Sequence, residues 1–215
     1  MPKQRVSDIN TNHWRTLYYH DPAHVLRRLR ATKRELADAL HDADNKVRCF
    51  RTTELNQYRE WRDAALFTYM IGLAMGVPVG YATEATSDYD FVTAWTRGDE
   101  AFFCPVQLKE LVPADLNRGA TLDGLLLALR KYAGPTQTVL AIRLNRRGRI
   151  DLVREWPPVP FAQLWFFWAA APAASRWSIY GDALGTPRQW AFDYPAWPMT
   201  RKAMGVAGSR PPHHR

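Results

Sequence analysis

Three polar side chains in the middle of the chain have the chemistry needed to hydrolyse a phosphate ester. Asp90 stands in one apolar segment, and Gln107 and Lys109 stand two residues apart in a later one. Carboxylate and amide oxygens are hard ligands suited to Mg²⁺ or Mn²⁺. A neighbouring ammonium group can orient an attacking water or neutralise charge that develops on the phosphate. These residue types indicate metal-assisted hydrolysis, provided that the fold brings them together.

The elements around these residues are expected to be strands. From residue 79 the apolar residues recur with a period near two, and a turn is expected at Arg97-Gly98-Asp99. The expected strands cover residues 79–84, 89–95 and 101–111. Because side chains alternate along a strand, Gln107 and Lys109 share one face of the third strand. If the second strand pairs with it, Asp90 can lie on that same face.

Helices are expected on either side of these strands. Thr52-Thr53 begins a helical apolar pattern that closes at Gly76, and Thr121 begins another that Gly134-Pro135 ends. Asp21-Pro22 is expected to begin an N-terminal helix. The expected helices cover residues 22–43, 54–75 and 121–132, followed by a strand over 138–144. Later segments are less regular: a hairpin strand over 150–154, a helix or strand over 161–171, and short strands over 177–180 and 189–192.

This arrangement resembles the PD-(D/E)XK nuclease superfamily. The match is Ser87-Asp-Tyr-Asp90-Phe followed by Val106-Gln107-Leu-Lys109, within the element order helix, strand, strand, strand, helix, strand. The resemblance covers residues 54–145. It implies a restriction-endonuclease-like α/β fold with a mixed central sheet flanked by helices, Asp90 and Gln107 as ligands of Mg²⁺ or Mn²⁺, and Lys109 as the catalytic lysine. No proline precedes the Asp, and Gln in place of the usual acid is similar to the Mrr-like branch.

A further carboxylate is expected, because Gln107 is neutral and leaves the metal with one less compensating charge. Family members often supply such a group from the first helix, for which Glu60 is preferred over Glu54. Glu84 and Asp88 are nearer to Asp90 in sequence and remain alternatives. Glu110 is excluded, because its odd offset from Gln107 and Lys109 points it to the opposite face of the strand.

The charge of the chain favours a polyanionic partner. The 29 lysines and arginines outnumber the 21 aspartates and glutamates, for a net charge of +8. The densest basic stretch follows the strand at 138–144, and its side chains are candidates for contacts with nucleic-acid phosphates, or else form a solvated turn. These candidates are Arg143, Arg146, Arg147 and Arg149.

The chain is expected to form one domain with appendages. They are an N-terminal helical extension over 1–50, a nuclease-like core over 51–156, a Trp- and Pro-rich part of the same domain over 157–200 and a disordered basic tail over 201–215. The two cysteines belong to no zinc-site spacing, and no apolar stretch is long enough to span a bilayer. A cytoplasmic protein is therefore expected. A homodimer is a separate expectation.

Two functions follow from this reading. The first is a Mg²⁺-dependent endonuclease that acts on nucleic acid, with DNA as the expected substrate. The alternative is a module that keeps the nuclease fold and binds nucleic acid or a protein partner without turnover, for which the neutral Gln107 is the motivating observation.

Overall fold

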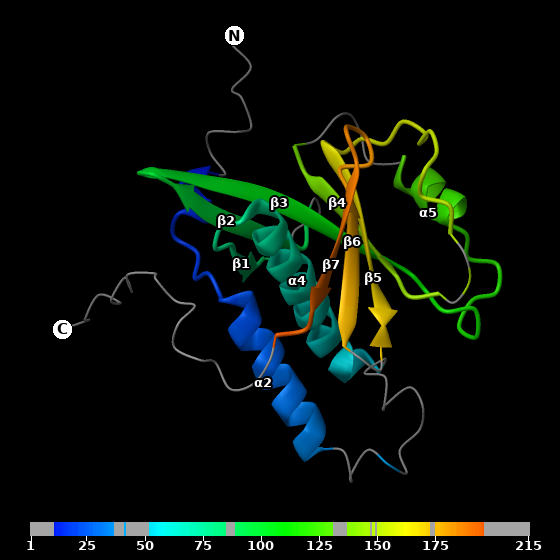
Figure 1. Cartoon of the computed structure of the whole chain (residues 1–215), viewed down its shortest axis with the longest axis horizontal. Coiled ribbons are helices and arrows are strands. Elements are labelled where there is room, and N and C mark those ends of the chain that lie inside the picture. The colour runs from blue at the N-terminus through cyan, green and yellow to red at the C-terminus, as the bar shows by residue number, and fades with distance from the viewer. Residues whose placement is uncertain are drawn as a thin grey trace.

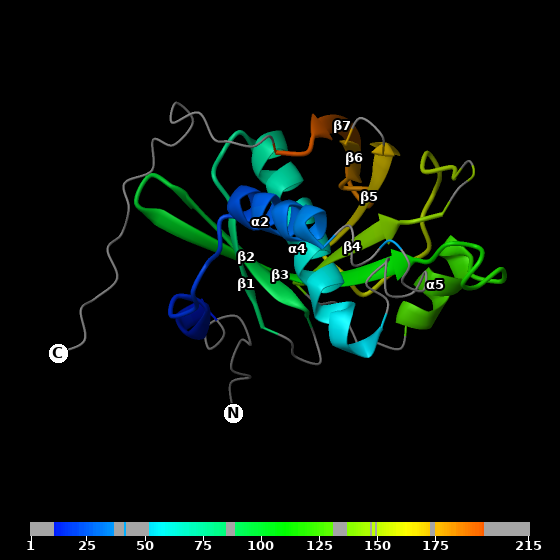
Figure 2. The ribbon, with the colours of Figure 1, turned by 90° about the horizontal axis from the view of Figure 1, so that it is seen from below.

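In the part of the chain that the structure describes, the fold is that of a mixed α/β protein built around one curled sheet of seven strands (Figure 1). The computed structural model describes residues 11–36, 41, 52–84, 89–130, 137–146, 148, 150–172 and 175–195. Helices α2 (Pro22–Glu35) and α4 (Thr53–Met75) lie side by side over the sheet, and α5 (Leu122–Leu129) lies apart from them (Figures 1 and 2).

Helix α4 confirms the helix expected at 54–75. It ends where Gly76 adopts a left-handed conformation with φ 69°, and the Gly76 N–H donates to carbonyls of the last turn. Helix α2 begins as expected, since the Asp21 carboxylate accepts from the N–H groups of Ala23 and His24. It ends at Glu35 rather than at residue 43.

The sheet follows the order of the chain from one edge to the other. Its strands are β1 (Gly80–Thr83), β2 (Phe91–Arg97), β3 (Glu100–Leu111), β4 (Val139–Leu144), β5 (Gln163–Ala171), β6 (Arg176–Gly181) and β7 (Arg188–Asp193). Neighbouring strands are antiparallel except for β3, β4 and β5, which run parallel to one another. The strands expected at 79–84, 89–95, 101–111, 138–144, 177–180 and 189–192 are thereby confirmed, and the segment 161–171 is a strand.

The hairpin expected at 150–154 is wrong. No strand occurs there, because both edges of β4 are already paired, with β3 on one side and β5 on the other. Every residue of β4 is buried. A strand buried on both faces reads as a continuous apolar run, which is what the Val139–Leu144 segment is, apart from one arginine.

The two faces of the sheet have separate cores. On one face α2 and α4 pack against Phe91, Val106 and Ala141. On the other face α5 packs against residues of opposite parity, among them Leu140 and Ile142. The segment containing Trp14 covers a further part of the sheet beside Val92 and Phe103.

Helix α2 and strand β6 share one hydrophobic cluster with helix α4. Leu26 of α2 and Ile179 of β6 lie in one cluster with Ala65 of α4, and all three are fully buried. Among the described helices, none has both the length and the apolar character that crossing a membrane would require.

Candidate functional site

The structure brings Asp90 and Gln107 into direct contact. Phe91 pairs with Val106, and the Asp90 N–H donates to the Val106 carbonyl at 2.9 Å, so Asp90 lies across from Gln107. The Gln107 amide Nε2 donates to Asp90 Oδ2 at 2.5 Å, and the backbone N–H of Leu108 donates to the same oxygen at 2.6 Å. The expected pairing of the two strands and the expected parity are therefore both present.

Lys109 lies on the same face of β3 as Gln107. It follows Gln107 by two residues without a break in the pairing of β3 with β4, where Gln107 lies opposite Leu140 and Lys109 opposite Ile142. Gln107 is buried and Lys109 is half-buried. An acid, an amide and an ammonium group thus occupy one face at the junction of β2 and β3.

Glu84 lies at the adjoining position of the sheet but already has partners. Thr83 of β1 pairs with Phe91, so Glu84 and Asp90 are the next residues outward on the two chains. Glu84 Oε1 is 2.6 Å from His13 Nε2, and its Oε2 accepts from the Tyr89 hydroxyl at 2.9 Å. The rival candidate Asp88 lies outside the described residues. Glu84 would have to exchange these partners before it could bind a cation near Asp90.

Glu60 is not brought to the other candidates. Its side chain is exposed on α4 and accepts from Asn56 Nδ2 at 2.6 Å. Helix α4 packs on the face of β3 that carries Val106, and Gln107 projects from the opposite face. Sequence spacing predicted the helix but not which face of the sheet it covers.

The oxygen donors at Asp90 and Gln107 fit a hard cation. Mg²⁺ usually keeps several waters and takes few protein ligands, so one carboxylate and one amide oxygen can suffice. The Gln107 amide would need to turn, because its NH₂ group faces Asp90 in this arrangement. Within the described ranges, no group of three or more His, Cys, Asp or Glu side chains could hold a metal ion.

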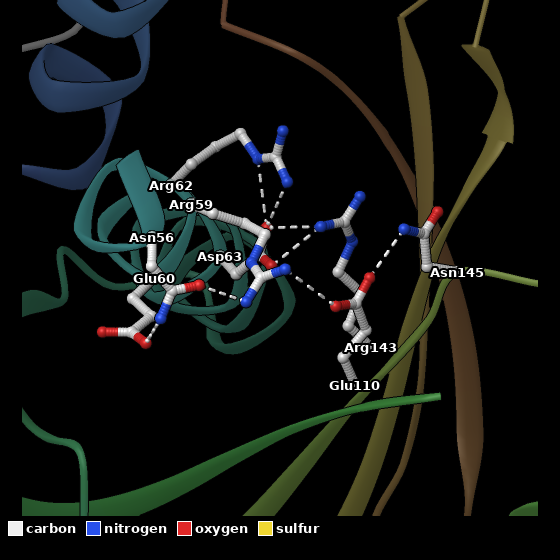
Figure 3. A network of polar contacts seen from close by, with 8 residues as sticks. All are labelled: Asn56, Arg59, Glu60, Arg62, Asp63, Glu110, Arg143 and Asn145. Atoms are coloured by element: carbon white, nitrogen blue, oxygen red, sulfur yellow. Dashed lines mark hydrogen bonds and ion pairs between the residues drawn. The ribbon is translucent and has the colours of Figure 1, made fainter. Parts of the chain in front are cut away.

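A second cluster of charged groups lies on the opposite face of β3 (Figure 3). Asp63 of α4 accepts from Arg143 of β4 at 2.8 Å and from Arg62 at 3.0 Å. Glu110 accepts from Asn145 at 2.6 Å and lies 3.6 Å from Arg59. Glu110 therefore projects from the face of β3 that is opposite to the face of Gln107 and Lys109, as its odd offset in the sequence predicted.

Asp63 and Arg143 were not singled out as a pair from the sequence. Both are buried. Arg143 is the one charged residue of the otherwise apolar strand β4, and Asp63 directly precedes the apolar second half of α4. Burial lowers the pKa of the Arg143 guanidinium, and the Asp63 carboxylate counteracts that effect. The signal in the sequence was an arginine within an apolar strand, because a charge that is buried there requires a partner.

The expected phosphate-binding arginines have other placements. Arg143 is 9% exposed and bound to Asp63, so it is not positioned to contact nucleic acid. Arg146 donates hydrogen bonds to the backbone carbonyls of Asn117, Arg118 and Ala120 and so holds the loop before α5 in place. Arg147 and Arg149 lie outside the described residues.

Comparison of the chain with protein-family models, with curated proteins and with solved structures finds no match.

Proposed function

We propose that the protein is a metal-dependent hydrolase of phosphodiester bonds in nucleic acid, with DNA as its substrate. The observation that carries this proposal is the contact of Asp90 with Gln107 on the face of the sheet that also holds Lys109. These three side chains come from two neighbouring strands, so their relative positions are set by backbone pairing.

The order of elements also supports the proposal. Helix α4 is followed by β1, β2 and β3, then by α5 and β4, with β4 parallel to β3. This is the helix, strand, strand, strand, helix, strand order that the resemblance to the PD-(D/E)XK superfamily implies. Asp90 directly precedes the second strand, and the Gln-x-Lys motif is on the third.

Each residue has a distinct part in the proposed reaction. Asp90 and Gln107 would hold Mg²⁺ or Mn²⁺ through one carboxylate and one amide oxygen. A divalent cation bound there supplies Lewis-acid stabilisation of a phosphate oxygen and a more acidic water. Lys109 would orient the attacking water and offset the negative charge that builds up on the phosphate as the new P–O bond forms.

The test is cleavage of plasmid and linear DNA by the purified protein with Mg²⁺ or Mn²⁺. Lys109→Ala is expected to lower the rate by about 100-fold or more, because removing one preorganised electrostatic contact costs that much in other enzymes. Arg188→Ala removes an exposed cation at β7, at the far edge of the sheet, and serves as the control for charge. Cleavage by Lys109→Ala at the rate of the unaltered protein would rule out this site.

Metal binding provides a separate test of the same site. Titration calorimetry with Mn²⁺ should show a binding event that Asp90→Ala abolishes. Glu84→Gln tests the neighbouring carboxylate. Glu84 is expected to contribute less to Mn²⁺ binding, because its two oxygens already form hydrogen bonds with His13 and Tyr89. Unchanged Mn²⁺ binding by Asp90→Ala would exclude Asp90 as a ligand.

A specific observation favours a second candidate, a nuclease-fold module without turnover. One oxygen of Asp90 already accepts two hydrogen bonds, from Gln107 and from the Leu108 N–H, which is how a purely structural carboxylate is satisfied. Such a module would bind DNA with equal affinity in EDTA and in Mg²⁺. The catalytic proposal instead requires metal-dependent cleavage, so one set of binding and cleavage assays separates the two.

A further inference from the structure

A cavity of about 310 Å³ lies between α2, α4 and the adjoining ends of β5 and β6. It is on the face of the sheet that the two helices cover, opposite to the face that carries Asp90 and Gln107. Its volume is at the lower end of the range of small-molecule sites, which begins at roughly 300 Å³. The cavity is therefore separate from the proposed metal site and large enough for one small ligand.

The lining of this cavity is cationic. Two helices each contribute a pair of basic residues spaced by three, which places both members of a pair on one side of the helix. The pairs are Arg30 and Lys33 of α2, and Arg59 and Arg62 of α4. No acidic residue occurs among the described residues that line the cavity.

Among the described residues, the acids near the cavity do not cancel this charge. Asp63 is shared by two guanidinium groups, those of Arg62 and Arg143. Glu110 lies 3.6 Å from Arg59 and also accepts from Asn145. Since two carboxylates face three arginines there, and Arg30 and Lys33 lie across the cavity, a positive excess remains.

One of these cations is held in position. The Arg30 guanidinium lies 4.5 Å from the ring centroid of Tyr194 and donates to the hydroxyl of Ser175. The Tyr194 hydroxyl in turn donates to the Leu26 carbonyl at 2.7 Å, which fixes the ring under Arg30. A guanidinium that is already oriented loses less entropy when it binds an anion.

Aromatic and apolar side chains supply the rest of the wall. Tyr58 lines the cavity and keeps 43% of its surface exposed, so its ring is accessible to a ligand. Trp177 also lines it, and Leu29 and Ala169 add apolar surface. Aromatic rings beside guanidinium groups favour a ligand that combines a flat aromatic ring with a negatively charged group.

From the cationic pairs and the aromatic wall we infer that this cavity binds a mononucleotide, with the phosphate among the four cations and the base against the aromatic wall. This class of ligand follows because cationic side chains, aromatic side chains and a volume sufficient for a small molecule occur together in this cavity. This inference is independent of the proposed hydrolytic activity, because no residue of the Asp90 site lines the cavity.

Titration calorimetry of the full chain with AMP and GMP, in EDTA and at low salt, tests the inference. At least one nucleotide should bind, while adenosine, guanosine and inorganic phosphate alone should each bind at least about tenfold more weakly, since each lacks half of the contacts. Comparable affinity for phosphate alone or for a nucleoside alone would overturn the assignment. The absence of nucleotide binding would overturn it as well.

Two neighbouring residues of α2 provide matched variants. Lys33→Glu places a negative charge in the cavity and should weaken nucleotide binding by about tenfold or more. Arg34→Glu makes the same charge change on the same helix at an exposed residue outside the cavity lining, and should change the affinity by less than about twofold. Equal losses in the two variants would show a general charge effect and reject the site.

A third variant tests the aromatic wall without altering charge. Tyr58→Ala should weaken binding of the nucleotide and leave the weak binding of inorganic phosphate unchanged. Asp90→Ala should bind nucleotide like the unaltered protein, because Asp90 lies on the other face of the sheet. Loss of nucleotide binding in Asp90→Ala would place the ligand at the metal site and contradict the inference.

Discussion

At the scale of single residues, Asp63 and Arg143 form an ion pair in which both partners are buried. Arg143 donates to both carboxylate oxygens, at 3.1 and 2.8 Å, and its guanidinium lies 5.9 Å from the centre of the Trp177 ring. A buried ion pair contributes little net stability compared with an apolar pair, but losing one partner leaves an uncompensated charge. The contact joins α4 to the central strand of the sheet.

Asp63→Ala should lower the free energy of unfolding by about 3–5 kcal/mol, because it leaves the Arg143 guanidinium buried without a negatively charged partner. Urea denaturation followed by circular dichroism measures this change. Asp115→Ala removes an exposed loop carboxylate and should stay within about 0.5 kcal/mol of the unaltered protein.

The double variant Asp63→Leu with Arg143→Met completes this test. It removes both charges and should recover most of the stability lost in the single variant. A single variant as stable as the unaltered protein would show that Arg143 reaches solvent, in conflict with its burial.

At the scale of elements, the sequence is most informative where local signals and tertiary packing agree. Helix α4 was predictable because Gly76 stops it, and the face shared by Gln107 and Lys109 was predictable from strand alternation alone. The hairpin after β4 was not, because a turn signal at Asn145–Arg149 cannot report that β3 and β5 already occupy both edges of that strand. The prediction of Glu60 as a metal ligand was wrong for a related reason, since the spacing of residues in the sequence does not tell which face of a sheet a helix covers.

The two threonine caps make a matched pair at this scale. The Thr121 hydroxyl accepts from the Gly124 N–H at 3.0 Å at the start of α5, whereas Thr52 at the start of α4 makes no such hydrogen bond. Thr121→Ala should therefore cost about 1 kcal/mol of unfolding free energy, and Thr52→Ala only a few tenths. Chemical denaturation of both variants measures the difference. Equal costs would mean that the hydroxyl contact at Thr121 contributes nothing beyond threonine's own propensity.

At the scale of the whole molecule, the two ends of the described chain are joined through one core. The Tyr194 hydroxyl, just beyond β7, donates to the Leu26 carbonyl of α2, and Arg30 donates to Ser175. Strand β5 pairs with β4 from Gln163 to Phe167 and completes the burial of β4. The described residues of the segment 51–156 consequently share their packing with α2 and with the C-terminal strands.

A chain that ends at residue 156 should therefore fail to fold cooperatively. It would lack β5, β6 and β7, leaving the apolar strand β4 at an open edge and removing Phe167 and Ile179 from the core beneath α4. Circular dichroism during thermal and urea unfolding, together with the dispersion of amide resonances, would measure this. A chain that ends at residue 195 retains every described element and is the reference. A cooperative transition in the shorter chain would show that β1 to β4 with α4 and α5 form an independent core, and that β5 to β7 are an addition to it.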